Sequence, residues 1–469
     1  MAICLSFWAG FFTLSNAQQS EVGIVWEVPG DTYSAQIELG AFKTLGVTHI
    51  EIPYPVSEEI KPLLRDSSFS FLIRSPQKFL TVSGLQQQRS SLRTTITELG
   101  REYSSYANVS GIGVVTHSQT DHPDFLPSVN SILSTAVQEI DTPFYFVQNQ
   151  NWYWLSSPEN PFAVYFDDSE YQRSDLKDFS DFMSENGQDK IQIINSNWLL
   201  EATNDFPEIE TALKEFTASG NWMLPHPNTK ETTLLKANWM VLIFIFLWAS
   251  LTLQIRFLPY VRSVIIRYFF AHRFFVDDIL GYRERAVAGG ILQMITHAIF
   301  GGLVFFMASH LLFSDLGIEA IFHYFPWLSL TVQNYYSFFV FGFGITLVFQ
   351  LLALIWLHLP AKNLTHFSQT LNLYSGIFYI DYIIVTIMLT LFTAGAGHLF
   401  TLGFAVAFLL IWYLSFYITA FDIAQNNRDN KALYLLLTVV LYSLIIVTLL
   451  VVVLLFTDVI SVFKLAAYL

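Results

Sequence analysis

The stretch ALYLLLTVVLYSLIIVTLLVVVLLF, residues 432–456, has no charged side chain and is long enough to cross the roughly 30 Å hydrocarbon core of a bilayer as one helix. Five further apolar stretches of similar length, with Asp381 as their one charged residue, occur earlier in the second half of the chain. The predicted spans lie near 239–255, 287–312, 335–357, 373–393, 399–421 and 432–456. We therefore predict an integral membrane protein whose carboxy-terminal domain, 239–469, is an all-α bundle of six transmembrane helices.

Composition supports this prediction and separates the chain into two halves. The chain is 53% hydrophobic and 13% charged, with a mean hydropathy of +0.44, which is too apolar for an ordinary soluble protein. Residues 21–238 hold 14 Lys and Arg against 29 Asp and Glu, net −15, whereas 239–469 hold 10 against 9, net +1. Phosphate binding requires clustered Lys and Arg, so the acidic half argues against a nucleic-acid partner.

The first residues, MAICLSFWAGFFTLSNAQQS, form an apolar run that ends in Ser15-Asn16-Ala17. Small residues at these positions are typical of a secretory cleavage site, so we predict a signal peptide at 1–17. The Lys or Arg that usually precedes such a run is missing, and a short persistent anchor is the alternative. The sole cysteine, Cys4, lies in this segment, so the mature chain is expected to have no disulfide and no thiolate metal site.

The segments between the predicted spans differ in positive charge. If the amino-terminal domain is exported, nine Lys and Arg fall in cytoplasmic segments and Lys464 alone falls outside. The nine are Arg256, Arg262, Arg267, Arg273, Arg283, Arg285, Lys362, Arg428 and Lys431. Because cytoplasmic loops are rich in Lys and Arg, we predict a multi-pass protein of the cell (inner) membrane with its amino-terminal domain outside the cytoplasm.

Between the first two predicted spans, arginines lie on one helical arc and large apolar residues on the other. The apolar set is Phe257, Val261, Val264, Ile265, Tyr268, Phe269 and Phe275. This pattern predicts an interfacial helix whose arginines lie among anionic head groups, with membrane lipids as partners. A topology signal without lipid specificity is the simpler alternative.

Several polar side chains fall inside the predicted spans, where they are costly and therefore functional candidates. They are Gln293, His297, His310, Gln350, Asp381 and His398. Gln293, His297 and Asp381 are the strongest, because Asp381 is the one carboxylate inside a span and His297 follows Gln293 by four residues on one helical face. A transporter needs several such groups in series, and hydrogen bonding between helices is the alternative.

Residues 270–457 resemble the Yip family of multi-spanning membrane proteins in the order of their features. The segment FFVDDILGYRERAVAGGILQMI, 274–295, resembles the cytoplasmic lead-in to that family's first span. KNLTHFSQTLNLYSGIFYIDYIIV, 362–385, has a polar loop and a Phe-x-x-Thr start to a span, and LLIWYLSFYITAFDIAQNNRDNKALYLLLTVVLYSLII, 409–446, has a short polar loop before a Lys-Ala restart. The resemblance implies a helical bundle associated with membrane organisation and carries over no catalytic residue.

The first half alternates short apolar or β-branched runs with helical patterns. The predicted strands are 23–27, 48–52, 69–73, 111–116, 144–148, 163–166, 191–195 and 222–224, and the predicted helices are 33–45, 85–106, 125–140, 176–185 and 209–216. Alternation of this kind favours parallel pairing, and eight units close an α/β, (β/α)₈ TIM-barrel-like domain over 18–227. The connection 149–161 has no helical pattern, so a doubly wound open sheet is the alternative. A tether, 228–238, joins this domain to the bundle.

The segment GDTYSAQIELGAFKTLGVTHIEI, 30–52, resembles the first β-α-β unit of clan A glycoside hydrolases, in which Gly46 ends the helix in a left-handed conformation. That family has an Asn-Glu pair after the fourth strand and a Glu after the seventh. This chain has Thr116-His117 and Asn195-Ser196 there. Glycoside hydrolysis needs two carboxylates at set separations, so the expected domain is non-catalytic.

Polar and aromatic side chains follow the predicted strands at their carboxyl ends, where this fold binds ligands. The candidates are Glu27, Glu51, Arg74, His117, Asn149, Trp152, Trp154, Asp167, Asp168, Asn197 and Trp198, with His226 after the last strand. Trp rings can stack on sugar faces beside polar groups that bind hydroxyls, and packing at the barrel rim is the alternative. The sequence has no HxH, HExxH or GxSxG pattern at these positions, so we expect neither a metal, nor a cofactor, nor a hydrolase triad.

These observations favour a membrane protein whose exported, non-catalytic barrel binds a carbohydrate or a protein of the cell envelope and is coupled to a Yip-like bundle. A membrane-anchored glycoside hydrolase is one alternative, and a transporter that uses Asp381 is another.

Overall fold

The computed structural model divides the chain into two compact units, Met1–Thr232 and Thr233–Leu469. The division falls within the sequence of the predicted tether, 228–238. The described residues are 20–65, 68–77, 79–114, 117–118, 127–133, 140, 142–148, 150–166, 171–185, 190–224, 239–283, 287–329, 334–362, 364–395, 397–426, 431–456 and 458–468.

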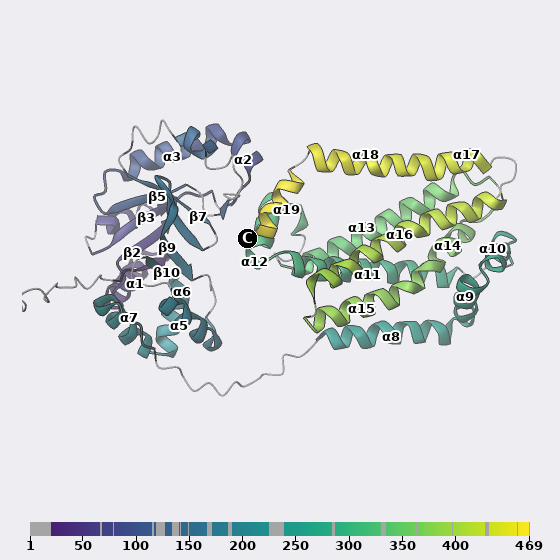
Figure 1. Cartoon of the computed structure of the whole chain (residues 1–469), viewed down its shortest axis with the longest axis horizontal. Coiled ribbons are helices and arrows are strands. Elements are labelled where there is room, and N and C mark those ends of the chain that lie inside the picture. The colour runs from purple at the N-terminus through teal and green to yellow at the C-terminus, as the bar shows by residue number, and fades with distance from the viewer. Residues whose placement is uncertain are drawn as a thin grey trace, which may run out of the picture. The chain divides into compact units, whose positions relative to one another are not determined.

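Eight strands of the first unit close a barrel in the order β1-β10-β9-β8-β7-β5-β3-β2 (Figure 1). Their bounds are β1 (Val22–Val25), β2 (His49–Pro53), β3 (Ser70–Arg74), β5 (Val109–Gly113), β7 (Phe144–Gln148), β8 (Asn151–Trp154), β9 (Ser157–Phe166) and β10 (Ile191–Asn195). Two short strands, β4 (Phe79–Leu80) and β6 (His117–Ser118), form a separate parallel pair. The closed barrel excludes the doubly wound open sheet, the alternative left by the sequence.

The barrel is mixed, which corrects the predicted all-parallel (β/α)₈ arrangement. Strand β8 is antiparallel to both β7 and β9, and the other barrel pairs are parallel. The connection 149–161 is too short for a crossover helix, and antiparallel strands need only a tight turn. The predicted eighth strand, 222–224, is not a strand: Trp222 packs on Phe179 and Phe216 and donates its Nε1–H to Ser180 Oγ at 3.1 Å.

Helices surround the strands and bury a first core between the two layers. They are α1 (Thr32–Thr44), α2 (Val82–Gln87), α3 (Arg89–Tyr103), α5 (Leu176–Glu185), α6 (Ser196–Asp205) and α7 (Glu208–Ser219). Outward strand residues such as Ile24, Ile50 and Phe71 join this core. Because side chains alternate along a strand, their neighbours Val25 and Leu72 point inward and form a second core inside the barrel with Trp152.

Local signals define the first helix as the sequence predicts. The side chain of Asp31 accepts a hydrogen bond from the Ser34 backbone N–H at 2.8 Å and thereby caps the start of α1. Gly46 has φ +81° just after the helix, which confirms its predicted left-handed conformation.

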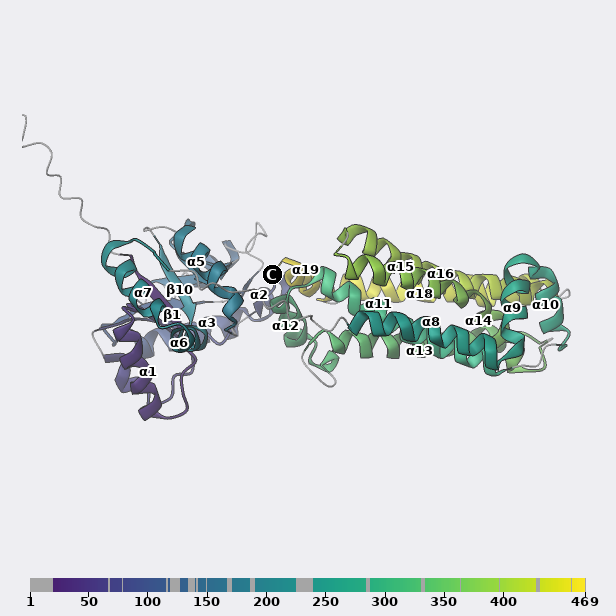
Figure 2. The ribbon, with the colours of Figure 1, turned by 90° about the horizontal axis from the view of Figure 1, so that it is seen from below.

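The second unit is helical throughout its regular structure (Figures 1 and 2). Its elements are α8 (Trp239–Phe257), α9 (Pro259–Phe270), α10 (His272–Leu280), α11 (Ala288–Leu312), α12 (Asp315–Tyr324), η3 (Pro326–Leu328), α13 (Tyr336–His358), α14 (Phe367–Ser375), η4 (Gly376–Ile380), α15 (Asp381–Thr393), α16 (His398–Asn426), α17 (Lys431–Leu435), the π-helical turn η6 (Leu436–Val440), α18 (Leu441–Phe456) and α19 (Val459–Tyr468). Five helical segments among the described residues are long and apolar enough to cross a membrane: 288–312, 336–358, 367–393, 398–425 and 431–455. A sixth span is present if the bent pair Leu242–Phe257 and Tyr260–Phe270 counts as one.

The pair α8 and α9 is bent by 104°, which suits the interfacial helix predicted for this segment. Phe270 on α9 and Phe274 just beyond it are 87% and 71% exposed, as side chains that enter lipid would be. The Arg267 guanidinium of α9 forms an ion pair with the Asp278 carboxylate of α10 at 2.7 Å.

The connecting segments gather at the two ends of the bundle (Figure 2). At one end, the Gln369 amide of α14 donates to the carbonyls of Ile279 and Leu280 at the end of α10, at 3.2 and 3.0 Å. At the opposite end α12 packs on α19, where a Cβ on Gly317 would lie 2.2 Å from the carbonyl oxygen of Ala466. Connections therefore alternate between the ends, as a chain that crosses a membrane repeatedly requires.

Candidate functional site

One group of polar side chains lies where the parallel strands of the barrel end. We call Glu27, Glu51, Arg74, Tyr145 and Asn197 the barrel-mouth cluster. Its members come from β2, β3 and β7 and from the segments that follow β1 and β10. The closed barrel thus places together residues that are as much as 170 positions apart in the sequence.

Glu51 is the buried centre of the barrel-mouth cluster. Its side chain is 1% exposed, one carboxylate oxygen accepts the Tyr145 hydroxyl at 2.7 Å, and the other lies 3.3 Å from Arg74 Nη1. Burial raises the pKa of the Glu51 carboxyl, although Arg74 and Tyr145 both act to lower it. The Glu51 carboxylate in turn raises the pKa of the Arg74 guanidinium. Arg74 remains 27% exposed, so it can bond Glu51 and still meet a ligand.

The sequence did not single out Tyr145 as a site residue. Its ring crosses the barrel interior because Gly113, on the neighbouring strand, has no side chain: a Cβ there would lie 2.7 Å from Tyr145 Cζ. Burial raises the pKa of the Tyr145 hydroxyl well above its ordinary value, so it stays a proton donor to Glu51. The alternation of FYFVQ, which points Tyr145 opposite to Phe144 and Phe146, was the available signal.

Glu27 and Asn197 form the exposed part of the cluster. The Asn197 side-chain amide donates to Glu27 at 2.8 Å, and the Glu27 backbone N–H donates to Ser196 Oγ at 3.1 Å. Asn195 sets this geometry, because its side chain caps α6 by accepting the backbone N–H groups of Asn197 and Trp198. The helix cap at the end of β10 therefore places the Asn197 side chain near the end of β1.

Two of the three candidate tryptophans contact Tyr145 of the barrel-mouth cluster, and the third is buried elsewhere. Trp152 is 2% exposed inside the barrel and stacks on Tyr145 at a centroid distance of 5.2 Å. Trp154 pairs with Tyr145 across β7 and β8, meets the Tyr145 ring edge-on at a centroid distance of 6.1 Å, and stacks on Phe162 at 4.0 Å. Trp198 is fully buried against Phe179. Trp152 and Trp198 contribute core packing, and the reversed direction of β8 places Trp154 opposite Tyr145.

The remaining barrel candidates are not placed. Asn149, Asp167, Asp168 and His226 lie outside the described residues, and His117 is described only as backbone in β6. Among the described residues, no group of three His, Cys, Asp or Glu is close enough to hold a metal.

In the bundle, two of the three strongest intramembrane candidates meet directly. His297 Nδ1 on α11 lies 2.5 Å from Asp381 Oδ2 at the start of α15, and both side chains are fully buried. Gln293, also fully buried, is one turn before His297. His310 instead stacks on Tyr335, and His398 begins α16, so neither joins this pair.

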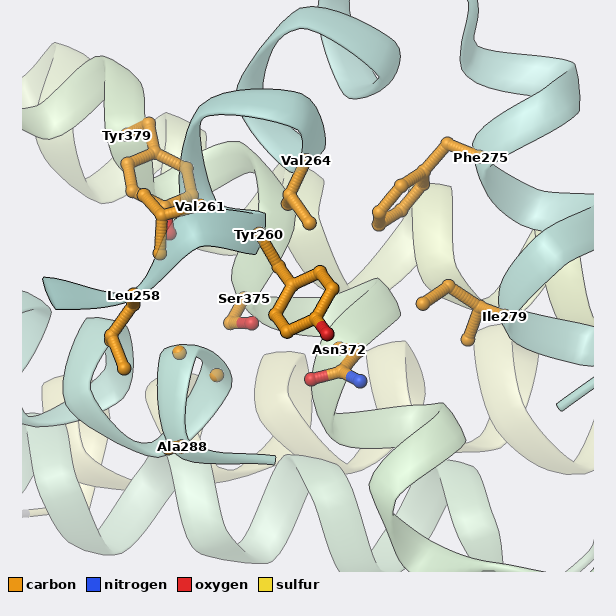
Figure 3. A pocket seen from close by; sticks show the side chains of 12 residues that line it. Leu258, Tyr260, Val261, Val264, Phe275, Ile279, Ala288, Asn372, Ser375 and Tyr379 are labelled. Atoms are coloured by element: carbon orange, nitrogen blue, oxygen red, sulfur yellow. The ribbon is translucent and has the colours of Figure 1, made fainter. Parts of the chain in front are cut away.

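A cavity of about 50 Å³ lies between α9, α10, α11 and α14 (Figure 3). Asn372 and Ser375 of α14 and Tyr260 of α9 supply its polar groups, and Gly289 and Gly290 of α11 form part of its wall. By the same measure a water molecule needs about 10–15 Å³, so the cavity has room for water.

An apolar groove of about 1040 Å³ runs between α8 and α11. Its polar groups are few: Ser250 and Gln254 of α8 bond the Tyr382 hydroxyl at 3.3 and 2.9 Å, and Thr296 lies on α11. Such a groove suits hydrocarbon chains rather than a polar ligand.

Compared with models of known protein families and with curated proteins, the chain matches none.

Proposed function

We propose that the barrel is a binding domain for a neutral carbohydrate, held at a membrane by the helical bundle. The observation that carries this proposal is the barrel-mouth cluster, in which Arg74, Glu27 and Asn197 offer donors and acceptors around the buried Glu51. Sugar hydroxyls both donate and accept hydrogen bonds, so they suit a mouth that holds both kinds of group. In this proposal the domain faces away from the cytoplasm and the bundle is Yip-like.

The geometry favours binding over hydrolysis. Glu51 is 1% exposed, one of its oxygens accepts the Tyr145 hydroxyl and the other forms an ion pair with Arg74, so it acts as a positioning group for Arg74. Among the described residues of the cluster, Glu27 is then the one exposed carboxylate. Glycoside hydrolysis normally needs two that reach the sugar. Asn195, at the position where the resemblance called for the catalytic Glu after the seventh strand, is occupied as a helix cap.

Charge favours a neutral ligand. The barrel-mouth cluster holds two carboxylates and one guanidinium, and residues 21–238 carry a net charge of −15. A ligand with carboxylate or phosphate groups would be repelled by this field as it approached. Among sugars, neutral ones are therefore expected to bind more tightly than acidic ones.

The test uses the full-length protein in lipid nanodiscs on an array of neutral, acidic and amino oligosaccharides. Asn197→Ala should weaken binding of a retained neutral sugar about 2–10-fold, the value of one hydrogen bond. Asn204→Ala is the matched control, because Asn204 is an exposed residue of the same helix, α6. Arg74→Lys should also weaken binding, since it keeps the charge that Glu51 needs but loses the guanidinium fork.

The proposal fails if no saccharide binds, or if Asn204→Ala weakens binding as much as Asn197→Ala does. Release of sugar by the native protein that disappears in Glu27→Gln would instead support the glycoside hydrolase alternative. General acid–base catalysis contributes about 10²–10⁴-fold, so such a loss would be easy to measure.

A further inference from the structure

Among the described residues, five polar side chains with no exposed surface lie on α11, on α13 and at the start of α15. They are Gln293 and His297 on α11, Thr346 and Gln350 on α13, and Asp381 at the start of α15. Polar groups at such depth are costly, so they are retained where they pair with one another or bind something. We call them the bundle cluster.

His297 and Asp381 are held in a fixed geometry. The His297 ring lies between the rings of Phe378 and Phe408, at centroid distances of 3.9 and 4.6 Å and with both pairs within 17° of parallel. Its Nδ1 is bonded to Asp381, and its Nε2 and the second carboxylate oxygen, Oδ1, have no hydrogen-bond partner among the described residues. The pair therefore keeps one free polar atom on each side.

One face of α11 runs from the cavity of Figure 3 to the pair His297 and Asp381. Gly290, Gln293 and His297 lie on one face of α11, spaced by three and four residues, over about 10 Å. A Cβ on Gly290 would meet Asn372 Oδ1 at 2.8 Å and Ser375 Oγ at 3.2 Å, and both these residues line the cavity. The same face of α11 thus meets the cavity at its start and Asp381 two turns later.

The 3₁₀ turn η4 places Asp381 on the same side of its helix as Ser375. A continuous α-helix would point Asp381 about 120° away from Ser375. A 3₁₀ turn advances about 120° per residue instead of about 100°, and η4 has 5 residues, so it rotates Asp381 back to the side of Ser375. The irregular turn therefore places Asp381 on the face that lines the cavity.

Thr346 and Gln350 extend the cluster on the other side. Contacts between Gly301 and Thr346 and between Gly342 and Phe305 show that α11 and α13 are antiparallel neighbours, and this register sets Gln350 at the level of His297. Past Gly301, the α11 side chains Leu303, Val304 and Phe306 are buried and apolar. Among the described residues, this series of buried polar side chains thus begins near α9, includes His297 and Asp381, and ends at Thr346.

We propose that the bundle cluster is a proton-binding site reached from the α9 end through the cavity. His297 and Asp381 share one proton, which keeps the buried pair neutral. Loss of that proton to water in the cavity leaves a negative charge, which the N–H and O–H groups of Gln293, Gln350 and Thr346 can solvate. Both amide groups have an unpartnered donor and an unpartnered acceptor, and this suits a site that changes charge.

The surrounding titratable groups, apart from Tyr379, are engaged elsewhere. On the α14–η4–α15 helix, Tyr374 accepts the Trp412 Nε1–H at 3.1 Å and Tyr382 bonds Gln254 of α8, while Tyr379 lines the cavity. On α16, the acidic residue is Asp422, which bonds His272 at 3.0 Å at the α10 end of the bundle. At the end of α13, His358 bonds Thr370. The described part of the bundle thus places no second acid beside Asp381.

The test is infrared difference spectroscopy of the full-length protein in nanodiscs, between mildly acidic and mildly alkaline buffer. We expect a carbonyl band of a protonated carboxyl group that appears on acidification, vanishes in Asp381→Asn and shifts in Asp381→Glu. Asp422→Asn is the matched control, because it removes the carboxylate of the second His–Asp pair, and it should leave the band in place. His297→Gln should move the midpoint of the titration.

Access is tested with Asn372→Leu, which fills the cavity without touching the pair. This change should leave the midpoint unaltered and slow the exchange of the carboxyl proton for deuterium, since a blocked route alters a rate and not an equilibrium. A band that does not respond to buffer pH, or that survives in Asp381→Asn, would overturn the site. Unchanged exchange in Asn372→Leu would overturn the route, and a midpoint set by sodium or potassium concentration would overturn the proton as its ligand.

Discussion

Replacement of Arg74 by Met tests whether Glu51 is a charged group buried at the barrel mouth. The change removes the cation 3.3 Å from a carboxylate that is 1% exposed, while the apolar part of the side chain keeps much of its packing. Removal of one partner from a buried ion pair costs about 3–5 kcal/mol. Because water reaches Arg74, which is 27% exposed, we expect the lower end, about 3 kcal/mol. For a unit of this size that is a loss of about 6–12 °C in melting temperature.

The stability that Arg74→Met loses should increase with pH. Burial already raises the pKa of Glu51 above its ordinary value of 4.5, and Arg74 acts against this rise. A carboxyl with a raised pKa stabilises the fold fully below its unfolded pKa, and this contribution disappears as pH rises through the folded pKa. Without Arg74 the folded pKa rises further, so Arg74→Met should cost most at about pH 8 and clearly less at about pH 5.

The assay is thermal unfolding of full-length protein in nanodiscs at both pH values, monitored by a signal from the barrel. Glu51→Gln and the double variant Glu51→Gln/Arg74→Met complete a cycle in which the substitution of Glu51 removes the buried charge. We expect the double variant to recover most of the stability that Arg74→Met loses at alkaline pH. Equal losses at both pH values, or no recovery in the double variant, would refute the assignment of a buried charge to Glu51.

Three further outcomes follow from other parts of the chain. Gly113→Ala should force Tyr145 away from Glu51 and cost about 1–3 kcal/mol, measured by the same unfolding assay, and an unchanged melting temperature would contradict the close packing inside the barrel. A reporter active only outside the cytoplasm should work when fused near Glu319 and fail near Arg283, and the reverse pattern would invert the orientation. The hydrogen bond to Asp422 of α16 raises the pKa of His272. The contact between these two side chains is therefore expected to persist below the ordinary pKa of 6.5 and to be lost as pH rises through the raised pKa. Hydrogen exchange in α10 should then increase with pH in the native protein and not in His272→Gln.

Features that depend on neighbouring residues were predictable from the sequence. Each candidate span is a property of one continuous stretch, so length and lack of charge located the five helical segments among the described residues that are apolar enough to cross a membrane. Asp31 and Gly46 set the ends of α1 through bonds and backbone angles within a few residues. Short runs of apolar or β-branched residues likewise predicted seven of the eight barrel strands.

What remained was decided by the tertiary structure, because local patterns do not carry direction or partner. A strand with alternating side chains has the same pattern whether it runs parallel or antiparallel, so the reversal of β8, which pairs Trp154 with Tyr145, was not visible. Tyr145 reaches Glu51 only because the neighbouring strand has Gly113 at that level. His297 and Asp381 are 84 positions apart, and their meeting depends on how α11 packs on α15 and on the extra rotation of η4, neither of which is encoded within a single segment.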